Sequence, residues 1–309
     1  MTAYKFRFRN KTNDLTDLPL VWATAKKKTK IADKQTTGKA FVIAVADLQV
    51  GKVDQRGGTA ELLQRVFASY DRIEEKLRKG KYERVLIVDV GDIVEGFSNK
   101  ADMQQTFSND LSIMQQVDVA LSLIWDLMKR ASKYCGDVSY ISVASNHCQF
   151  RLNKQQVGKP GQDDWGVMIA KQIHRLAIET QTPVQVLIPD PNDESLAVDV
   201  FSDGFHVLGV WHGHQSGRPD GVPTWWRQQA FGNQPVAAAT IGLTGHFHHL
   251  RVQELGASSN GGSRFWIQSS TMDSGSGWFR LTAGEDSSCG ITCFELNKNE
   301  RFTGSVWKL

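Results

Sequence analysis

Short apolar runs that end in polar residues alternate with amphipathic stretches along the first half of the chain. Apolar positions at helical spacing predict helices, because residues three or four apart share one face of a helix. The continuous apolar runs between them are typical of strands buried in a parallel sheet. The pattern predicts strand, helix, strand, helix, strand and helix at 41–46, 59–79, 84–90, 111–133, 138–144 and 164–180.

The second half of the chain is richer in strand signals. Apolar runs predict strands at 205–211, 237–243, 264–268 and 290–296, and the Gly- and Ser-rich segment 256–263 predicts a turn. Strands that alternate with helices predict a largely parallel sheet with helices on its faces, and the later strands predict a second sheet. We therefore expect an α/β fold whose β-sandwich core of two mixed sheets is flanked by helices.

Length and composition fit this picture. The chain has 309 residues, of which 40% are hydrophobic and 22% are charged, as in an ordinary globular protein. No apolar run reaches the roughly 18 residues that a membrane span needs. The first residues lack the apolar stretch of a secretory signal, and the four cysteines form no paired pattern. We expect a cytoplasmic protein that does not bind membranes.

The first 40 residues differ in charge from the rest of the chain. They contain ten Lys or Arg and three Asp or Glu, whereas the remainder is slightly acidic. A basic arm can attract a polyanion such as nucleic acid, or it can be a solvated leader. Residues 4–8 alternate apolar and basic side chains as a strand does, and residues 24–39 are typical of a linker. We divide the chain into a basic arm and linker at 1–40 and one domain at 41–309.

Side chains that bind metal ions follow the predicted strands. The carboxyl ends of parallel strands lie at one edge of a sheet, so these side chains are expected to gather there. Carboxylates, amides and imidazoles are the ligands that a hydrolytic metal centre uses. The set comprises Asp47, Gln49, Asp92, Asn146, His147, His212, His214, His246 and His248.

The order of these residues resembles that of the calcineurin-like metallophosphoesterases. The segments DLQ, GDIVE, SNH, HGH and GHFH occur in the order of the family's D-x-H, GDxx[DE], GNH[DE], lone-His and GHxH motifs, over residues 41–250. One such motif is a weak signal, whereas five in order, each after a predicted strand, are specific. The resemblance implies the family's fold, hydrolysis of a phosphoester, and two divalent metal ions. Mn²⁺ is favoured, with Mg²⁺, Zn²⁺ or Fe as alternatives.

The resemblance also implies a role for each residue at the strand ends. Asp92 would bridge the two metal ions, and water activated by both would attack phosphorus. His147 would lie off the metal ions, near the leaving-group oxygen, and would donate a proton or stabilise the developing charge. The other ligands would divide between the ions, with Asp47, Gln49 and His248 at the first and Asn146, His212 and His246 at the second.

Three positions depart from the family's pattern. Gln49 replaces a histidine, and its neutral amide oxygen is expected to weaken the first metal site and to favour Mn²⁺ or Mg²⁺. Ser145 replaces a glycine, which can change the turn that follows. Cys148 replaces an acidic residue, so His147 is expected to lack its carboxylate partner. Glu95 fits the acidic position of the second motif, and we place it behind the ligands.

Aromatic and basic residues leave two interpretations open. The segments 225–227 (Trp-Trp-Arg) and 278–280 (Trp-Phe-Arg) can stack on nucleic-acid bases, or their rings can pack in the core. Arg227 and His214 are the candidates for contact with substrate. His214 is also the less favoured alternative to His212 as a metal ligand.

The basic arm and the aromatic segments favour nucleic acid as the substrate. We expect a nuclease that acts on DNA, similar to the DNA-repair exonuclease (SbcD-like) branch of the family and to some phage-encoded members. Lys52, soon after the first motif, can contact a phosphate or be a solvated lysine. Two alternatives stay open. One is a phosphodiesterase or phosphatase that acts on a small nucleotide, and the other is a non-catalytic scaffold like the retromer subunit of this superfamily.

Overall fold

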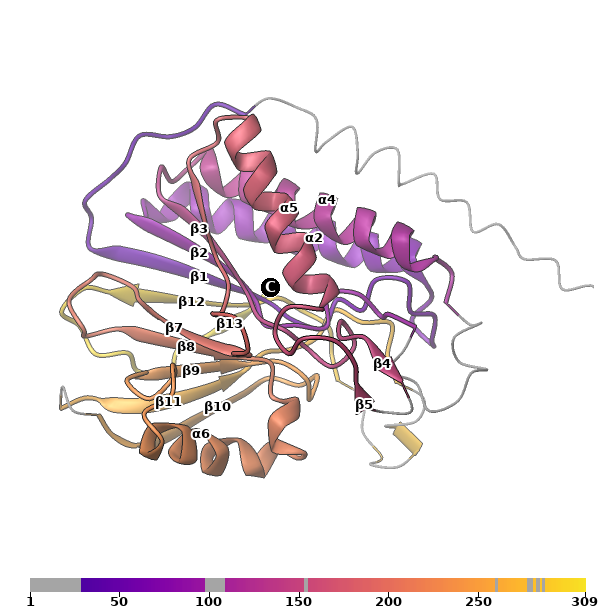
Figure 1. Cartoon of the computed structure of the whole chain (residues 1–309). Coiled ribbons are helices and arrows are strands. Elements are labelled where there is room, and N and C mark those ends of the chain that lie inside the picture. Colours follow the sequence, from indigo (N-terminus) through magenta and orange to yellow (C-terminus); the bar gives the residue numbers. More distant parts are fainter. Residues whose placement is uncertain are drawn as a thin grey trace, which may run out of the picture.

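Two β-sheets packed face to face form the core of the computed structural model, and helices cover their outer faces (Figure 1). The structure describes residues 29–97, 109–152, 155–258, 261–276, 280–281, 284 and 287–309. The strand predicted at 4–8 and the aromatic pair at 278–279 lie outside these residues. The prediction of an α/β fold with two mixed sheets flanked by helices is confirmed.

The first sheet has four parallel strands at its centre and one side. Strand β1 is buried from Ala40 onward because it has neighbours on both sides and layers on both faces. This is why its sequence is a continuous apolar run. The strand order is β13 (Trp307–Lys308), β12 (Thr292–Asn297), β1 (Lys39–Val45), β2 (Arg84–Asp89), β3 (Val138–Ser142) and β6 (Val184–Leu187), with β12 and β13 added antiparallel.

The second sheet has three parallel strands between two antiparallel edge strands. Its inner face packs on the first sheet through aliphatic side chains such as Leu208, Ile241 and Ile267. The strand order is β10 (Arg251–Ala257), β11 (Ser263–Gln268), β9 (Ile241–Thr244), β8 (Val207–Trp211) and β7 (Ser195–Asp199).

Three long helices cover the outer face of the first sheet (Figure 1). They are α2 (Thr59–Gly80), α4 (Ile113–Ser132) and α5 (Trp165–Glu179), and each agrees with its predicted range to within two residues. Ser112 and Asp164 cap α4 and α5 by accepting hydrogen bonds from backbone N–H groups of the first turn. Among the described helices, none is both long and apolar enough to cross a bilayer.

Smaller elements complete the described chain. A two-stranded hairpin, β4 (Arg151–Leu152) and β5 (Gln155–Gln156), follows β3. Two short 3₁₀ helices, η1 (His214–Ser216) and η2 (Pro219–Gly221), connect β8 to the helix α6 (Val222–Phe231).

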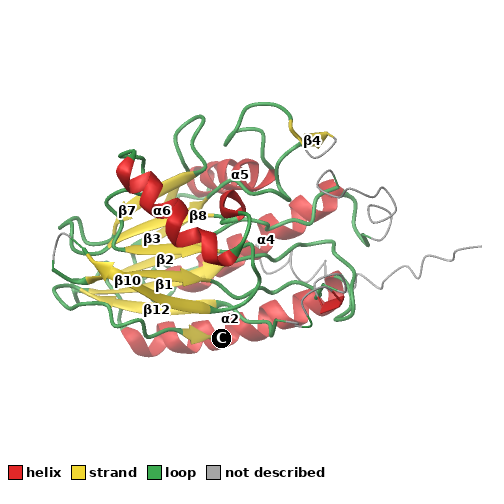
Figure 2. Ribbon diagram, turned by 90° about the horizontal axis from the view of Figure 1, so that it is seen from below, coloured by secondary structure: helices red, strands yellow, loops and turns green. Residues whose placement is uncertain are grey.

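Helix α6 lies across the outer face of the second sheet (Figure 2). Trp226 is buried there, and its Nε1–H donates to the carbonyl of Val236 at 3.0 Å. Its ring packs against Trp211, with ring centroids 5.6 Å apart, and Trp225 is partly buried beside them. Core packing is therefore the correct interpretation of Trp226. Arg227 is exposed on the same helix.

Gly242 on β9 lies under these two indoles. A Cβ atom there would lie 2.6 Å from Cη2 of Trp211 and 3.0 Å from Cζ3 of Trp226. We expect Gly242→Ala to lower the free energy of unfolding by about 1–3 kcal/mol, because the rings fill the space that the methyl group needs. Urea unfolding measures the difference. Gly232→Ala, after α6, meets its nearest atom only at 3.4 Å. An equal loss in both variants would contradict the steric explanation.

Candidate metal centre

Six loops that follow parallel strands meet at one edge of the sandwich. Three follow β1, β2 and β3 of the first sheet, and three follow β8, β9 and β11 of the second. All but one of the polar residues that these loops place together were predicted from the sequence. They are Asp47, Gln49, Asp92, Asn146, His147, His212, His246, His248 and, not predicted, Asp273.

Five of these residues have left-handed backbone conformations. The φ angle is 48° at Asp47, 43° at Gln49, 51° at Asp92, 71° at His246 and 65° at His248. Eleven described residues other than glycine have a positive φ, and these five make up nearly half of that group. This conformation costs about 1–3 kcal/mol for a residue with a side chain and is concentrated at functional sites.

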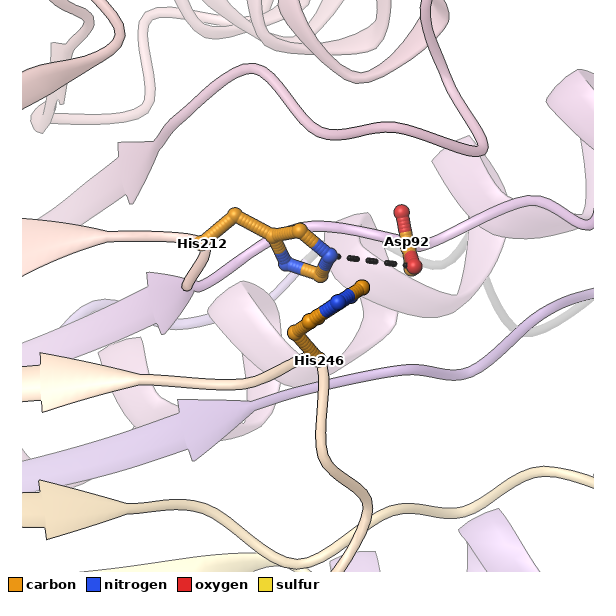
Figure 3. Close-up of side chains that lie close together, drawn as sticks. All are labelled: Asp92, His212 and His246. Carbon is orange, nitrogen blue, oxygen red and sulfur yellow. Dashed lines mark ion pairs between the residues drawn. The ribbon is translucent and has the colours of Figure 1, made fainter. Parts of the chain in front are cut away.

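Asp92, His212 and His246 lie close enough to hold one metal ion (Figure 3). One ligand atom from each lies within 4.8 Å of the others. Nε2 of His212 is 3.0 Å from Oδ2 of Asp92 and 3.0 Å from Oδ1 of Asn146. A carboxylate, an amide oxygen and two imidazoles suit a borderline divalent ion. We call Asp92, Asn146, His212 and His246 the His212 site.

The surroundings of the His212 site also fit a cation. Nδ1 of His212 donates to the carbonyl of Val90 at 2.7 Å, so a metal ion would bind through Nε2, which faces the other ligands. Oδ2 of Asp92 is buried and faces Nε2 of His212 at 3.0 Å and Nε2 of His147 at 3.9 Å. A buried carboxylate needs positive charge beside it to stay ionised, and a bound cation would supply that charge. The four residues therefore fit a divalent metal ion.

Gly91 leaves room for His212 at this site, and Ser145 holds the neighbouring loop in place. Gly91 has a φ of 103°, and a Cβ atom there would lie 2.5 Å from Nδ1 of His212. Oγ of Ser145 accepts a hydrogen bond from the backbone N–H of Asp92 at 2.7 Å, and its own N–H donates to Asp164 at 3.0 Å. The serine that departs from the family's glycine thus holds the loop that carries Asp92.

Mutual electrostatic effects set the charges of the His212 site. Burial opposes ionisation of Asp92, but His212 and His147 outweigh it and hold the pKa of Asp92 well below its usual range. Burial likewise lowers the pKa of His212, but Asp92 outweighs it and raises that pKa to about 9. Burial and the neighbouring His212 lower the pKa of His246 well below its ordinary value. Metal binding here therefore competes with a proton on His212.

His147 has a carboxylate partner, so the expectation that it lacks one was wrong. Its Nδ1 donates to the backbone carbonyl of Glu95 at 3.0 Å, and Oε2 of Glu95 lies 3.4 Å from the same nitrogen. Glu95 thus takes the place of the acidic residue that Cys148 replaces. Burial lowers the pKa of His147, but Asp92 and Glu95 raise it above its ordinary value. Its other nitrogen, Nε2, faces the site and lies 3.4 Å from Nε2 of Gln49 and 3.9 Å from Oδ2 of Asp92.

A second group of residues lies around His248. Its Nε2 is 3.4 Å from Oδ1 of Asp47, and its Nδ1 is 3.2 Å from Oδ2 of Asp273. Asp273 is buried and orients the imidazole, as carboxylates do behind metal-ligating histidines. Burial lowers the pKa of His248, but Asp273 and Asp47 raise it to about 10. We call Asp47, Gln49 and His248 the His248 site.

Lys52 lies between Gln49 and Asp273. Its Nζ donates to Oε1 of Gln49 at 2.7 Å and to Oδ2 of Asp273 at 2.6 Å. The side chain is 13% exposed, so it is not the solvated lysine that the sequence allowed. Burial lowers the pKa of Lys52, but Asp273 and Glu95 raise it more, so the ammonium stays charged. The amide nitrogen of Gln49 then faces Nε2 of His147, at 3.4 Å.

His214 lies beside the His212 site. Its Nε2 is 3.5 Å from Oε2 of Glu194, and its ring centroid is 5.5 Å from that of His212. Of the two histidines, His212 is the one whose nitrogen converges with the other ligands. Contact of His214 and Arg227 with substrate stays a prediction.

No family model matches the chain, and no curated protein matches it. Solved structures of other proteins align with most of this chain at low sequence identity. Wild-type Vps29 complexed with Zn²⁺ from Entamoeba histolytica is 14% identical, covering 86% of this chain and 96% of that one, with a TM-score of 0.35. A conserved protein from Streptococcus pneumoniae, described as a predicted phosphoesterase, is 12% identical over 88% and 97%, with a TM-score of 0.31. PhoD is 8% identical over 87% and 65%, with a TM-score of 0.37.

Proposed function

We propose that this protein is a metal-dependent phosphoesterase that hydrolyses phosphodiester bonds. The observation that carries the proposal is the convergence of four ligands at the His212 site, with Nε2 of His147 facing the same space. When bound there, a divalent cation supplies an activated water and neutralises charge on the phosphoryl group. The order of the motifs in the sequence supports the same chemistry.

The protein's own residues would then complete the hydrolysis. Asp92 keeps its negative charge and anchors the cation, because its pKa is held far below neutrality. Water would lose a proton to the solvent as its oxygen bonds to phosphorus and the ester P–O bond breaks. His147 donates its proton from Nε2 to the departing oxygen, and Glu95 holds the ring through Nδ1.

The number and kind of metal ions are part of the proposal. Oxygen and imidazole ligands favour Mn²⁺, with Mg²⁺, Zn²⁺ and Fe as alternatives. The His212 site fits an ion as it stands. At the His248 site, Gln49 turns its oxygen toward Lys52, so the set of ligands there is incomplete. The two ions per chain predicted from the sequence are therefore supported at one position only.

We propose DNA as the substrate, with a small nucleotide as the alternative. The basic residues of the first 40 positions support a polyanion. Burial of Trp226 removes one of the aromatic rings that could have stacked on bases, so the proposal depends more on charge than on stacking. His214 and the exposed Arg227 are the residues we propose to contact the substrate.

A Mn²⁺-dependent hydrolysis assay tests the function. The substrates are bis-p-nitrophenyl phosphate, p-nitrophenyl phosphate, cyclic nucleotides and labelled single- and double-stranded DNA, with Asp92→Asn as the blank. Cleavage of DNA that disappears in the variant supports the nuclease. Turnover of small esters alone supports the nucleotide alternative. No turnover of any substrate would defeat the proposed function and favour the scaffold.

The basic arm gives a separate prediction about binding. Replacing the three lysines at 26–28 with glutamine should weaken binding of single-stranded DNA. The slope of log K against log salt should fall by about 2, because each phosphate contact on a single strand contributes about 0.7. Filter binding across a salt series measures this. The control replaces three exposed residues of α2, namely Arg72, Arg78 and Lys79. Equal slopes for the wild type and the arm variant would show that the arm does not contact DNA.

A further inference from the structure

We infer that this protein holds one divalent metal ion, at the His212 site, and that the ammonium of Lys52 replaces a second ion at the His248 site. The inference rests on the metal centre proposed above and names its stoichiometry. Four buried or nearly buried side chains carry it: Lys52, Gln49, Asp273 and His248.

Gln49 is oriented as a hydrogen-bond donor toward the site. Its Oε1 accepts from Nζ of Lys52 at 2.7 Å, and its Nε2 lies 3.4 Å from Nε2 of His147. Rotating the amide by half a turn would place its NH₂ group against the ammonium, where both groups are donors and neither can accept. Lys52 therefore fixes the orientation. An amide NH₂ group is not a metal ligand, which disagrees with the ligand role that the family resemblance implies for Gln49.

The remaining residues of the His248 site are too few for a resident ion. Asp47 and His248 are left, while Asp92 already lies 3.0 Å from Nε2 of His212. Catalytic metal sites typically offer three protein ligands. The nearby carboxylate of Asp273 does not supply the missing one, because both of its oxygens are engaged. Oδ2 accepts from Lys52 at 2.6 Å and faces His248 at 3.2 Å, and Oδ1 accepts from the backbone N–H of Gly275 at 3.2 Å.

The nearby charges also favour a metal ion at the His212 site over one at the His248 site. The ammonium is held 2.6 Å from Asp273 in a nearly enclosed position, so the negative charge that would attract a cation is already balanced. A divalent ion beside Gln49 would meet this positive charge at short range in surroundings that screen poorly. Within the described part of the chain, no lysine or arginine contacts the four ligands of the His212 site.

The arrangement suggests how one ion is enough. Lys52 supplies the fixed positive charge beside Asp273 that a second ion would otherwise supply. Its hydrogen bond also directs the N–H donors of Gln49 toward the space that His147 faces. Lys52 acts through Gln49 and is a positioning residue rather than a catalytic one.

Metal stoichiometry tests the inference without reference to activity. The full chain is loaded with Mn²⁺, passed through a desalting column and analysed by mass spectrometry for metal per chain. We expect one ion in the wild type, with the electron paramagnetic resonance signal of an isolated Mn²⁺. We expect two ions in Lys52→Met, with the exchange-coupled signal of a metal pair, because the amide of Gln49 is then free to turn its oxygen inward.

Two further variants make the outcome decisive. Lys52→Met leaves Asp273 with one partner fewer, so the double variant Lys52→Met/Asp273→Asn removes both charges and should also bind two ions. Lys79→Met, on the exposed face of α2, is the control and should bind one. Two ions in the wild type, or one in both Lys52 variants, would overturn the inference. A wild type without metal would overturn the proposed metal centre as well. One ion without hydrolysis would defeat the proposed function but support this inference.

Discussion

Asp92→Asn should remove nearly all hydrolysis and most of the bound metal. Asp92 is the only carboxylate of the His212 site, its Oδ2 lies 3.0 Å from Nε2 of His212, and it is 1% exposed. Asparagine keeps the shape but loses the charge and turns one oxygen into an N–H donor. We expect kcat to fall by at least about 10³-fold, the upper end of what removing one preorganised electrostatic group costs. Steady-state kinetics and metal analysis of the same preparation measure both effects.

The matched control is another buried carboxylate at a distance from the strand ends. Asp126 on α4 is 4% exposed at its side chain and accepts from Nε of Arg130 at 2.8 Å. Asp126→Asn should destabilise the fold without a change in metal content. If Asp92→Asn retained activity near that of the wild type, the assignment of the His212 site as the metal centre would be wrong.

The second large effect is expected at His147. His147→Ala should lower kcat by about 10²–10⁴-fold, the range for loss of a general acid. Metal content should be unchanged, because His147 contacts Glu95 through Nδ1 and is not one of the four ligands. The loss should be larger for an alkyl ester than for a p-nitrophenyl ester, because p-nitrophenolate leaves without needing a proton.

Comparing the two leaving groups separates proton donation from general damage to the site. His174→Ala, at an exposed position of α5, is the control and should leave both rates unchanged. An equal loss for the two esters, or a loss of metal from His147→Ala, would show that His147 has another role.

The central strands and long helices could be predicted because tertiary packing reinforces their sequence pattern. β1, β2 and β3 are buried along almost their whole length, so each is a continuous apolar run. The edge strand β10 (Arg251–Ala257) lacks that signal because most of its side chains are half-buried or exposed. No prediction covered the edge strands β6 and β7 either. β6 has no buried side chain, whereas β7 is short, with three of its five residues buried.

The ligands could be predicted because each follows a parallel strand, and the topology alone then gathers them. Asp273 and Lys52 could not be paired in this way. They are 221 positions apart in the sequence, and a buried ion pair leaves no periodic pattern. Asp273 does follow a predicted strand, at 264–268, so its place at a strand end was the one available signal. Glu95 was placed behind the ligands from its motif, but its contact with His147 became visible only in three dimensions.

At the left-handed residues that follow the strands, the needs of the backbone and of the site conflict. Glycine would relax the backbone at Asp47, Asp92 or His248, but it would remove the side chain that the site needs. No single residue meets both demands, so the chain retains local strain that its packed sheets must offset. Selection for thermal stability alone would therefore replace these residues among the first. In a variant library selected for activity, these residues should therefore be retained. In a library selected only for folding, they should be lost.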